Sequence, residues 1–498
     1  MSQPSATALT NSTPDVLRSP IRLLVDGQWV EGTGESIDFF DPSEGTVLGT
    51  FAGASEADVD RAARAARAAL DGPWSRVTPA QRATLLWRLA DALEERIEEF
   101  SLLETLNTGK PLSLTRQFEL PQAVAILRYN AGWATKLNGE TRDVSLPGEW
   151  HTFTMRRPVG VAGLIVPWNN PIVMAAAKLG PALAAGCTTV LKPAELTPVT
   201  AARLGELICG LGFPDGVVNI VPGLGHVAGE AIATHPLVDK ISFTGSTAIG
   251  QHLQRTTAAT MKRLSLELGG KSPVLIFADA DLDRAIEAAA MSIYANSGQV
   301  CAAGSRLYVD ARVADRVISG IAERAAALRV GGGLEEGVTT GPLISARQRD
   351  RVLGYIEQGR EAGAGVAVGG SAPDRPGFFV QPTVLTDTHA DMSVVREEIF
   401  GPVLVTQTFD DPDDLDAILG RANASEYGLS SYIWTRDLSR AHRVARRLQA
   451  GNVRVNTYSG MDPNMPFGGF KASGYGKENG REGVEAYTEL TSVAIRLD

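Results

Sequence analysis

The chain has 498 residues, of which 44% are hydrophobic and 21% are charged, values typical of a globular enzyme of about three domains. The formal net charge of -10 argues against a nucleic-acid partner, because phosphate binding requires a basic surface. The three cysteines are too few and too scattered for a disulfide framework, which favours a reducing compartment and a cytoplasmic location. The six histidines form no metal-spaced cluster with them, so we expect no metal.

The first 20 residues are rich in Ser, Thr, Ala and Pro and lack an apolar core, which predicts a disordered tail and not a secretory signal. The longest apolar runs, such as residues 159–166, are too short to span a bilayer, and glycine interrupts them. We therefore expect no membrane segment. Residues 21–30 alternate around an Asp26-Gly27 turn and predict a small hairpin.

Two helices are predicted next from their capping boxes. Ser55 and Asp58 form the first box, and that helix is expected to end at Asp71-Gly72. Thr78 and Gln81 form the second box, with a proline at the first helical position. These helices carry no visible chemistry and are interpreted as packing elements.

Residues 159–267 alternate between short apolar strands and helices, which predicts a parallel sheet covered on both faces. The expected strands are residues 160–166, 188–191, 217–221, 240–243 and 264–266, and the expected helices are residues 172–185, 199–211, 227–234 and 247–258. Ligands of such sheets bind beyond the carboxyl ends of the strands. The pattern favours nucleotide binding, although the usual Gly-x-Gly-x-x-Gly fingerprint is missing.

Two loops of this unit are candidate nucleotide contacts. Thr244-Gly245-Ser246 lies where a strand gives way to a helix, so backbone N–H groups and the Ser246 hydroxyl could hold a phosphate. The alternative is a plain glycine turn with Ser246 as N-cap. Lys192 and Glu195 follow another strand, where an acidic residue can bind a ribose hydroxyl and favour NAD over NADP. The alternative is a solvated surface pair.

Cys301 lies in a loop of small and polar residues, after a helix predicted over residues 281–295 and before a strand-like run at 306–309. A thiol in such a loop is well sited for exposure and activation as a nucleophile. The alternative is a small buried hydrophobic residue, the usual role of a lone cysteine. Residues 268–470 are expected to form a second α/β domain.

Residues 150–156 and 487–497 are both extended and partly β-branched, so we expect them to pair as a small exposed sheet that contacts another subunit. The expected organisation is a Rossmann-like α/β cofactor domain with a parallel sheet over residues 21–137 and 159–267. A second, catalytic α/β domain covers residues 268–470, and a small β oligomerisation arm covers residues 138–158 and 480–498.

An ordered set of motifs resembles the aldehyde dehydrogenase superfamily over nearly the whole chain, from about residue 21 to the C-terminus. The motifs are Pro167-Trp168-Asn169, Lys192-Pro193-Ala194-Glu195, Phe243-Thr244-Gly245-Ser246, Glu267-Leu268-Gly269-Gly270-Lys271, Gly298-Gln299-x-Cys301, Glu398-Ile399-Phe400-Gly401-Pro402 and Pro466-Phe467-Gly468-Gly469. Each motif alone is weakly diagnostic, whereas the ordered set is specific.

The resemblance implies the following roles. Cys301 would attack the aldehyde as a thiolate, and the Asn169 side chain with the Cys301 backbone N–H would hold the oxyanion. Glu267 would activate the water that hydrolyses the thioester, and Lys178 and Glu478 would relay its protons. The residues implied to bind NAD are Ile165, Pro167, Trp168, Lys192, Glu195, Gly225, Gly229, Thr244, Gly245, Ser246, Leu268, Glu398 and Phe400. A homodimer or homotetramer is also implied.

The aldehyde tunnel is expected to be roomy. Many relatives line it with aromatic rings, whereas this chain has Asn170, Ala177, Ala295 and Met461 at positions that could hold them, and keeps Phe467. Small and polar residues add volume and hydrogen-bonding capacity, which favours bulky or polar aldehydes. The alternative is that neighbouring loops refill the space.

The main prediction is an NAD-dependent aldehyde dehydrogenase that releases a carboxylic acid. One alternative transfers the acyl group to coenzyme A, but acyl-transferring members commonly lack the base at Glu267. A second alternative is a non-catalytic structural protein on the same scaffold. NADP is the alternative cofactor, although Glu195 would repel its 2′-phosphate.

Overall fold

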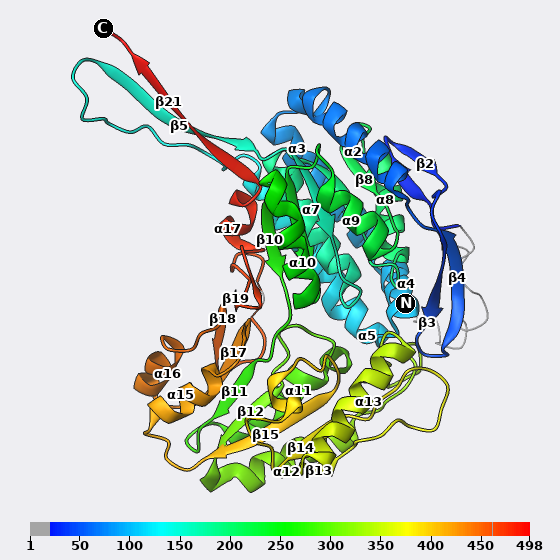
Figure 1. The fold of residues 1–498 in the computed structure, drawn as a ribbon, viewed down its shortest axis with the longest axis vertical. Coiled ribbons are helices and arrows are strands. Elements are labelled where there is room, and N and C mark those ends of the chain that lie inside the picture. The colour runs from blue at the N-terminus through cyan, green and yellow to red at the C-terminus, as the bar shows by residue number, and fades with distance from the viewer. Residues whose placement is uncertain (1–19, 461) are drawn as a thin grey trace, which may run out of the picture.

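The computed structural model describes residues 20–460 and 462–498. Two sheets with helices on their faces form the two lobes of the body, and a two-stranded ribbon extends away from it (Figure 1). The α/β class with parallel sheets, predicted from the alternation, is confirmed. The tail expected over residues 1–20 lies outside the described residues except for Pro20.

The first sheet contains the strands expected between residues 159 and 267. Its strand order within the described chain is β2 (Gln28–Val30), β1 (Leu23–Val25), β8 (Val218–Ile220), β7 (Thr188–Lys192), β6 (Val161–Ile165), β9 (Lys240–Thr244), β10 (Arg263–Glu267) and β20 (Gly474–Tyr475). The strands from β8 to β10 run parallel. The predicted hairpin supplies β1 and β2, and β20 returns from near the C-terminus to pair with β10.

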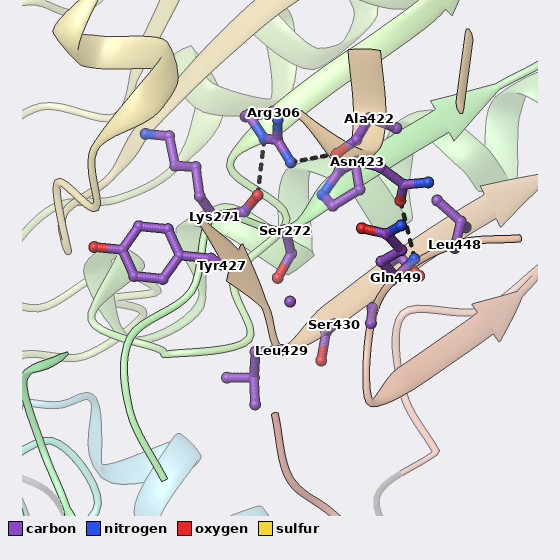
Figure 2. Close-up of a pocket in the computed structure, with 14 residues that line it drawn as sticks. Lys271, Ser272, Arg306, Ala422, Asn423, Tyr427, Leu429, Ser430, Leu448 and Gln449 are labelled. Carbon is purple, nitrogen blue, oxygen red and sulfur yellow. Dashed lines mark hydrogen bonds between the residues drawn. The ribbon is translucent and has the colours of Figure 1, made fainter. Parts of the chain in front are cut away.

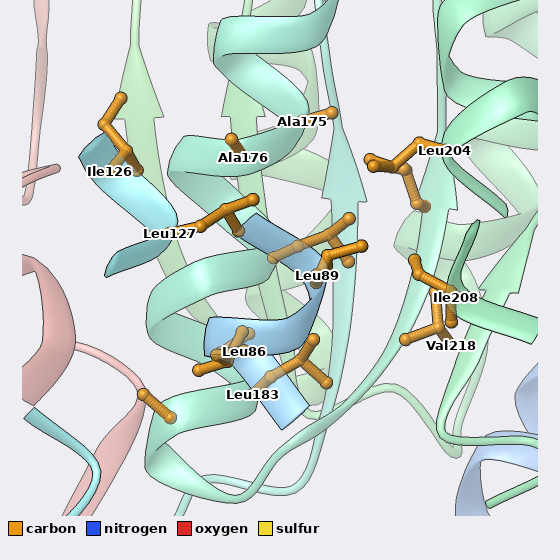
Figure 3. Close-up of a cluster of buried hydrophobic side chains, with 14 of the residues drawn as sticks. Leu86, Leu89, Ile126, Leu127, Ala175, Ala176, Leu183, Leu204, Ile208 and Val218 are labelled. Carbon is orange, nitrogen blue, oxygen red and sulfur yellow. The ribbon is translucent and has the colours of Figure 1, made fainter. Parts of the chain in front are cut away.

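Helices cover both faces of this sheet. One face is covered by α2 (Glu56–Asp71), α9 (Glu230–Thr234) and α10 (Thr247–Thr257). The opposite face is covered by α7 (Pro171–Ala185) and α8 (Val199–Gly210), with α3 (Pro79–Glu95), α4 (Ile97–Thr108) and α6 (Leu120–Trp133) packed outside them. Figure 3 shows this second core, in which Leu86, Leu127 and Leu183 from three helices meet.

Local sequence explains where several of these helices begin. Both predicted capping boxes are present, Ser55 with Asp58 at α2 and Thr78 with Gln81 at α3. The helix expected over residues 227–234 differs from the prediction, because residues 225–229 form a π-helical turn, η4, and the α-helix begins only at Glu230.

The second sheet lies between residues 273 and 455. Its strand order is β13 (Gly365–Val368), β14 (Thr383–Thr386), β15 (Val403–Phe409), β12 (Arg306–Asp310), β11 (Pro273–Ile276), β17 (Ser430–Trp434) and β18 (Asn452–Val455). All neighbouring pairs are parallel except β13 with β14. The helices around it are α11 (Leu282–Tyr294), α12 (Ala314–Ala327), α13 (Ala346–Glu361), α14 (Ser393–Arg396), α15 (Leu415–Asn423) and α16 (Leu438–Ala445).

The projecting ribbon pairs β5 (Trp150–Pro158) antiparallel with β21 (Thr488–Arg496), so the predicted pairing of these two segments is confirmed (Figure 1). The remaining elements are β3 (Ser36–Asp41), β4 (Thr46–Ala52), α5 (Leu112–Leu114), η3 (Thr115–Glu119), β16 (Tyr427–Gly428), β19 (Phe470–Lys471), α17 (Gly480–Glu485) and the short turns η2 (Trp74–Arg76), η5 (Ala258–Thr260), η6 (Ala295–Gly298) and η7 (Ala311–Val313). Among the described helices, none combines the length and the apolar character needed to cross a bilayer.

Candidate active site

A cavity of about 250 Å³ lies where the carboxyl ends of the first sheet face the second lobe. Catalytic candidates on its wall are Asn169, Glu267, Cys301 and Glu478. The other residues that line it are Gln122, Ile126, Pro167, Trp168, Asn170, Val173, Met174, Ala177, Thr244, Gly245, Ser246, Leu268, Gly269, Val300, Ala302, Gln348, Arg351, Glu398, Phe400, Phe467 and Asn479.

The loop that presents Cys301 is fixed by buried polar side chains. Helix α11 ends at Tyr294, and Asn296 and Ser297 then adopt left-handed backbone angles. The Ser297 hydroxyl donates to the Gly341 carbonyl at 2.6 Å, and Gln299 Oε1 accepts from the Ile344 N–H at 2.9 Å. These bonds attach the loop to the segment before α13. The short polar residues before Cys301 therefore set its position.

A glycine is required within this loop. Gly298 has a φ of +73°, and a β-carbon there would lie 2.0 Å from the Gly401 carbonyl oxygen. A side chain at this position would strain the backbone and displace the neighbouring segment.

Asn169 is joined directly to the same loop. It lies between β6 and α7, and its Nδ2 donates to the Gln299 carbonyl at 2.9 Å, two residues before Cys301. Asn296 Nδ2 donates in turn to the Asn169 carbonyl at 3.2 Å. Because a side-chain amide carries two N–H donors, Asn169 has a second donor that could hold a negatively charged oxygen in the cavity.

The Cys301 thiol is half-buried and free. Burial, with the carboxylates of Glu398 and Glu267, raises its pKa to about 12, against a weaker opposing effect of the Ala302 backbone N–H. This differs from the activated thiol expected from the sequence, because the lining brings carboxylates to the sulfur and no cation close enough to offset them. The chain alone therefore holds Cys301 as a neutral thiol at neutral pH.

Glu267 ends β10 and is 3% exposed. Neither of its carboxyl oxygens has a hydrogen-bond partner within the described residues. Burial raises the pKa of this carboxyl well above its usual range, and the Glu478 carboxylate raises it further. A buried, unpartnered carboxyl with a raised pKa is a candidate general base, because its carboxylate form binds a proton more tightly than an exposed glutamate does.

Lys178 lies behind the cavity wall and not on it. It is fully buried in α7, where its Nζ is paired with Glu478 and donates to the Ser242 hydroxyl at 2.9 Å. Lys178 therefore neutralises Glu478, and the Lys178 charge opposes the rise in the Glu267 pKa. The two residues predicted to act together are thus paired, and both affect the pKa of Glu267.

The residues that could hold the adenosine end of a dinucleotide follow successive strands. Ile165 and Lys192 end β6 and β7, and Gly225 begins the turn after β8. Lys192 Nζ donates to the carbonyls of Pro193 and Gly223, each at 2.8 Å, and lies 3.4 Å from the Glu195 carboxylate. Lys192 is therefore not the solvated half of a surface pair, whereas the Glu195 side chain is 36% exposed.

Gly225 and Gly229, two of the glycines implied to bind the cofactor, differ in their surroundings. A β-carbon on Gly229 would lie 3.7 Å from the Lys192 side chain, whereas one on Gly225 would meet nothing within 4 Å. These five residues, Ile165, Lys192, Glu195, Gly225 and Gly229, do not line the cavity that holds Cys301, and they flank it along the strand ends.

The residues that could hold the nicotinamide end of a dinucleotide line the cavity itself. Ser246 is the N-cap of α10 and accepts from the Ile249 N–H at 3.4 Å, so the N-cap alternative describes its local role. Its hydroxyl proton is still free to contact a phosphate oxygen. The buried Thr244 hydroxyl has no hydrogen-bond partner within the described residues. These donors fit a phosphate-bearing cofactor.

Two residues of the second lobe complete this end. Glu398 Oε1 accepts from the Gly270 N–H at 2.9 Å, and burial raises its pKa to about 7. The Phe400 ring meets Trp168 edge to face with centroids 5.3 Å apart. The second carboxyl oxygen of Glu398 is thus available to accept from a ribose hydroxyl, and the rings of Phe400 and Trp168 line the same cavity.

A second cavity, near Lys271 and Ser430, is excluded as a substrate site by its size (Figure 2). Its volume is about 10 Å³, room for a single water molecule. Arg306 lies at one side of it and donates to the carbonyls of Lys271 at 2.8 Å and Ala422 at 2.9 Å. These two hydrogen bonds connect the starts of β11 and β12 to the end of α15.

Across residues 20–460 and 462–498, no group of three or more His, Cys, Asp or Glu side chains could hold a metal ion.

Comparison with known proteins is consistent with this geometry. The model of the aldehyde dehydrogenase family matches residues 29–493. The chain belongs to the aldehyde dehydrogenase family. A phenylacetaldehyde dehydrogenase from Pseudomonas fluorescens is 45% identical over 489 residues, covering 97% of both chains, and a mitochondrial aldehyde dehydrogenase from Leishmania tarentolae is 46% identical over 483 residues, covering 96% of both.

A solved structure has the same fold. The NAD+ complex of the aldehyde dehydrogenase from Bacillus cereus matches with a TM-score of 0.95 and 43% identity, covering 98% of this chain and 99% of that one. The general reaction of this aldehyde dehydrogenase is thus the oxidation of an aldehyde, and the resemblance recognised in the motifs is confirmed.

Three of the five predicted tunnel residues of this aldehyde dehydrogenase line the cavity: Asn170, Ala177 and Phe467. Ala295 is not among the lining residues, because it is the first residue of η6 and the chain turns between it and Cys301. Met461 lies outside the described residues. The polar and small character expected of the tunnel therefore rests on Asn170 and Ala177.

Sequence reasoning missed part of the aldehyde dehydrogenase cavity wall. Gln122 and Ile126 come from α6, and Gln348 and Arg351 come from α13, two helices that no motif marked. The apolar residues Leu120, Val124 and Leu127 of α6 are a helix signal, yet nothing in that pattern indicates that its other face reaches a cavity.

Proposed function

We propose that this chain is an NAD-dependent aldehyde dehydrogenase that releases a carboxylic acid through a thioester on Cys301. The observation that carries the proposal is the meeting of Cys301, Asn169 and Glu267 on one cavity wall. An NADH-linked screen with mixed aldehydes, followed by identification of the product, tests it. A carboxylic acid as product supports the proposal, whereas an acyl-coenzyme A product or the absence of turnover would contradict it.

In the proposed reaction, the Cys301 thiol first releases its proton to water in the cavity, and the thiolate sulfur then bonds to the aldehyde carbon. The Asn169 amide and the Cys301 N–H stabilise the oxyanion that forms. NAD, when bound, would supply a cationic ring that favours the thiolate and would accept a hydride; loss of that hydride from the carbon bonded to Cys301 would leave a thioester. Glu267 then takes a proton from water, whose oxygen attacks the thioester and expels the Cys301 sulfur. Glu478 and Lys178 carry the proton away from Glu267.

The pH dependence of turnover should follow Glu267. Only its carboxylate form accepts a proton, and burial raises its pKa well above the usual 4.5, so kcat should rise as pH increases through that raised pKa. The expected profile of kcat, measured from about pH 5 to about pH 9, shows a limb that falls toward acid. A profile that stays flat down to pH 5 would contradict this role.

We further propose NAD over NADP as cofactor. The partly exposed Glu195 carboxylate lies where an adenosine ribose is held in such folds, and it would repel a 2′-phosphate. Glu195→Gln should lower the KM for NADP relative to NAD by about tenfold, because it removes a like charge and keeps the side-chain shape. A wild-type KM lower for NADP than for NAD would overturn the assignment.

The substrate is proposed to be a bulky or polar aldehyde. Asn170 and Ala177 line the cavity, and neither side chain fills it as an aromatic ring would. In a panel of aldehydes, kcat/KM for bulky or hydroxylated members should exceed that for acetaldehyde by about tenfold or more. A panel led by acetaldehyde would contradict the proposal and indicate that loops refill the tunnel.

The projecting ribbon supports a homodimer or homotetramer. A two-stranded sheet is marginally stable alone, and Leu490 and Ile495 on β21 are 52% and 43% exposed. Covering these side chains with a second subunit would bury apolar surface and pair the open edge of the ribbon.

The proposed location is the cytoplasm, since the working thiol Cys301 requires a reducing compartment.

A further inference from the structure

Asn170 is held in one orientation by a buried charge cluster behind the cavity wall. Lys110 Nζ donates to Asn170 Oδ1 at 3.2 Å and to the two carboxylate oxygens of Glu119 at 2.7 and 2.9 Å. An ammonium group can only donate hydrogen bonds, so the oxygen of the amide must face Lys110. The amide NH2 group, on the other branch of the same side chain, therefore faces away from Lys110.

This NH2 group has no structural task. Asn170 is the N-cap residue of α7, a position where asparagine usually caps the helix with its own oxygen, yet it makes no such bond. Glu104 takes that role instead, because its Oε1 accepts from the Ile172 N–H at 3.2 Å while its Oε2 accepts from the Thr200 hydroxyl at 2.8 Å. Within the described residues, Asn170 Nδ2 has no hydrogen-bond partner.

Asn170 Nδ2 is thus a donor of fixed direction on a residue that lines the cavity. Asn170 directly follows Asn169, the proposed oxyanion donor, and consecutive Cα atoms are about 3.8 Å apart. The Nδ2 donor therefore belongs to a residue adjacent to the one that would hold the aldehyde oxygen. A substrate atom that meets Nδ2 should be a hydrogen-bond acceptor within a few bonds of the aldehyde carbon.

The charges around the cavity determine whether the acceptor on the substrate should be negatively charged or neutral. Glu267 and Glu398 line the cavity, Arg351 is the single cation among the described lining residues, and the charge of Glu478 is neutralised by Lys178 behind the wall. An acceptor that carries a negative charge would be repelled by this lining, whereas a neutral hydroxyl, ether or carbonyl oxygen would not.

We propose that Asn170 is a specificity-determining residue, which selects aldehydes that carry a neutral oxygen acceptor within a few bonds of the aldehyde carbon. The proposal rests on the proposed aldehyde oxidation and narrows its substrate class. Lys110, Glu119 and Glu104 act as positioning residues, because they hold the Asn170 oxygen and cap α7 in its place.

Matched aldehydes test the donor. Methoxyacetaldehyde and butanal have the same chain length and differ by an ether oxygen in place of a methylene, and 3-methoxypropanal and pentanal form the second pair. An ether oxygen accepts but cannot donate. The readout is the ratio of kcat/KM for the ether to kcat/KM for its alkyl partner, compared between wild type and variants, because hydration of the aldehyde in water cancels in that comparison.

Asn170→Leu keeps the size of the side chain and removes the donor, and Asn170→Asp keeps an oxygen toward Lys110 and replaces the NH2 group with an acceptor. For at least one pair, both variants should lower the ratio by about fivefold to tenfold, the effect of one neutral hydrogen bond. Met174→Leu, on the same wall, removes no donor and should leave the ratio unchanged. In the wild type, the charged aldehyde 4-oxobutanoate should be oxidised less efficiently than 3-methoxypropanal.

Ratios that stay the same in both Asn170 variants, while butanal and pentanal are oxidised, would overturn this inference alone. A wild type that prefers 4-oxobutanoate to 3-methoxypropanal would overturn the assignment of a neutral acceptor. If the wild type oxidises none of the aldehydes, the proposed function fails together with the inference.

Discussion

Cys301→Ser should lower kcat/KM for every aldehyde substrate by about 10⁴-fold or more, the largest effect expected of any substitution in this chain. The hydroxyl that replaces the sulfur ionises far less readily than a thiol, and even the thiol has its pKa raised to about 12 by burial and the neighbouring carboxylates. The fold should be unaffected, because serine fits the same half-buried position. Initial rates of NADH formation measure the loss.

Cys209→Ser is the matched control, since Cys209 is an exposed free cysteine in α8 that does not line the cavity. It should keep wild-type kinetics. If Cys301→Ser retained a tenth or more of the wild-type kcat/KM, a covalent role for this sulfur would be untenable.

Glu267→Gln should separate the two halves of the reaction. The amide cannot accept a proton from water, so steady-state kcat should fall by about 10²- to 10⁴-fold while the first oxidation still occurs. Rapid mixing should show a burst of about one equivalent of NADH per active site, followed by slow turnover, because the thioester persists. Glutamine fills the same buried space beside Gly468, so the cavity should keep its shape.

Glu336→Gln makes the same chemical change at an exposed position outside the cavity and should behave as wild type. Steady-state turnover of Glu267→Gln within threefold of wild type, without a burst, would show that another group activates the water.

Local sequence signals were sufficient for much of the fold. The capping residues Ser55 and Thr78 begin α2 and α3 as predicted. The runs predicted as strands over residues 160–166, 188–191 and 264–266 form parallel strands. These features depend on neighbours in the chain or on a simple periodicity. The return of β20 to pair with β10 could not be predicted, because only tertiary packing brings residues two hundred positions apart together.

The candidate site also has features that local sequence predicts and features that only the folded structure supplies. Motifs located Cys301, Asn169, Glu267 and Glu398, and all four line one cavity. What the motifs could not supply are properties of the assembled environment. The raised pKa of Cys301 arises first from burial and then from carboxylates on three separate segments. The orientation of Asn170 arises from Lys110, 60 residues earlier in the chain. Neither effect leaves a local pattern.

The most direct test of the thioester mechanism is mass spectrometry of Glu267→Gln after mixing with NAD and an aldehyde and quenching in acid. The account predicts an increase in mass equal to one acyl group, carried by the peptide that contains Cys301 and absent from the Cys301→Ser protein. Formation of NADH with no acyl group on Cys301 would contradict it.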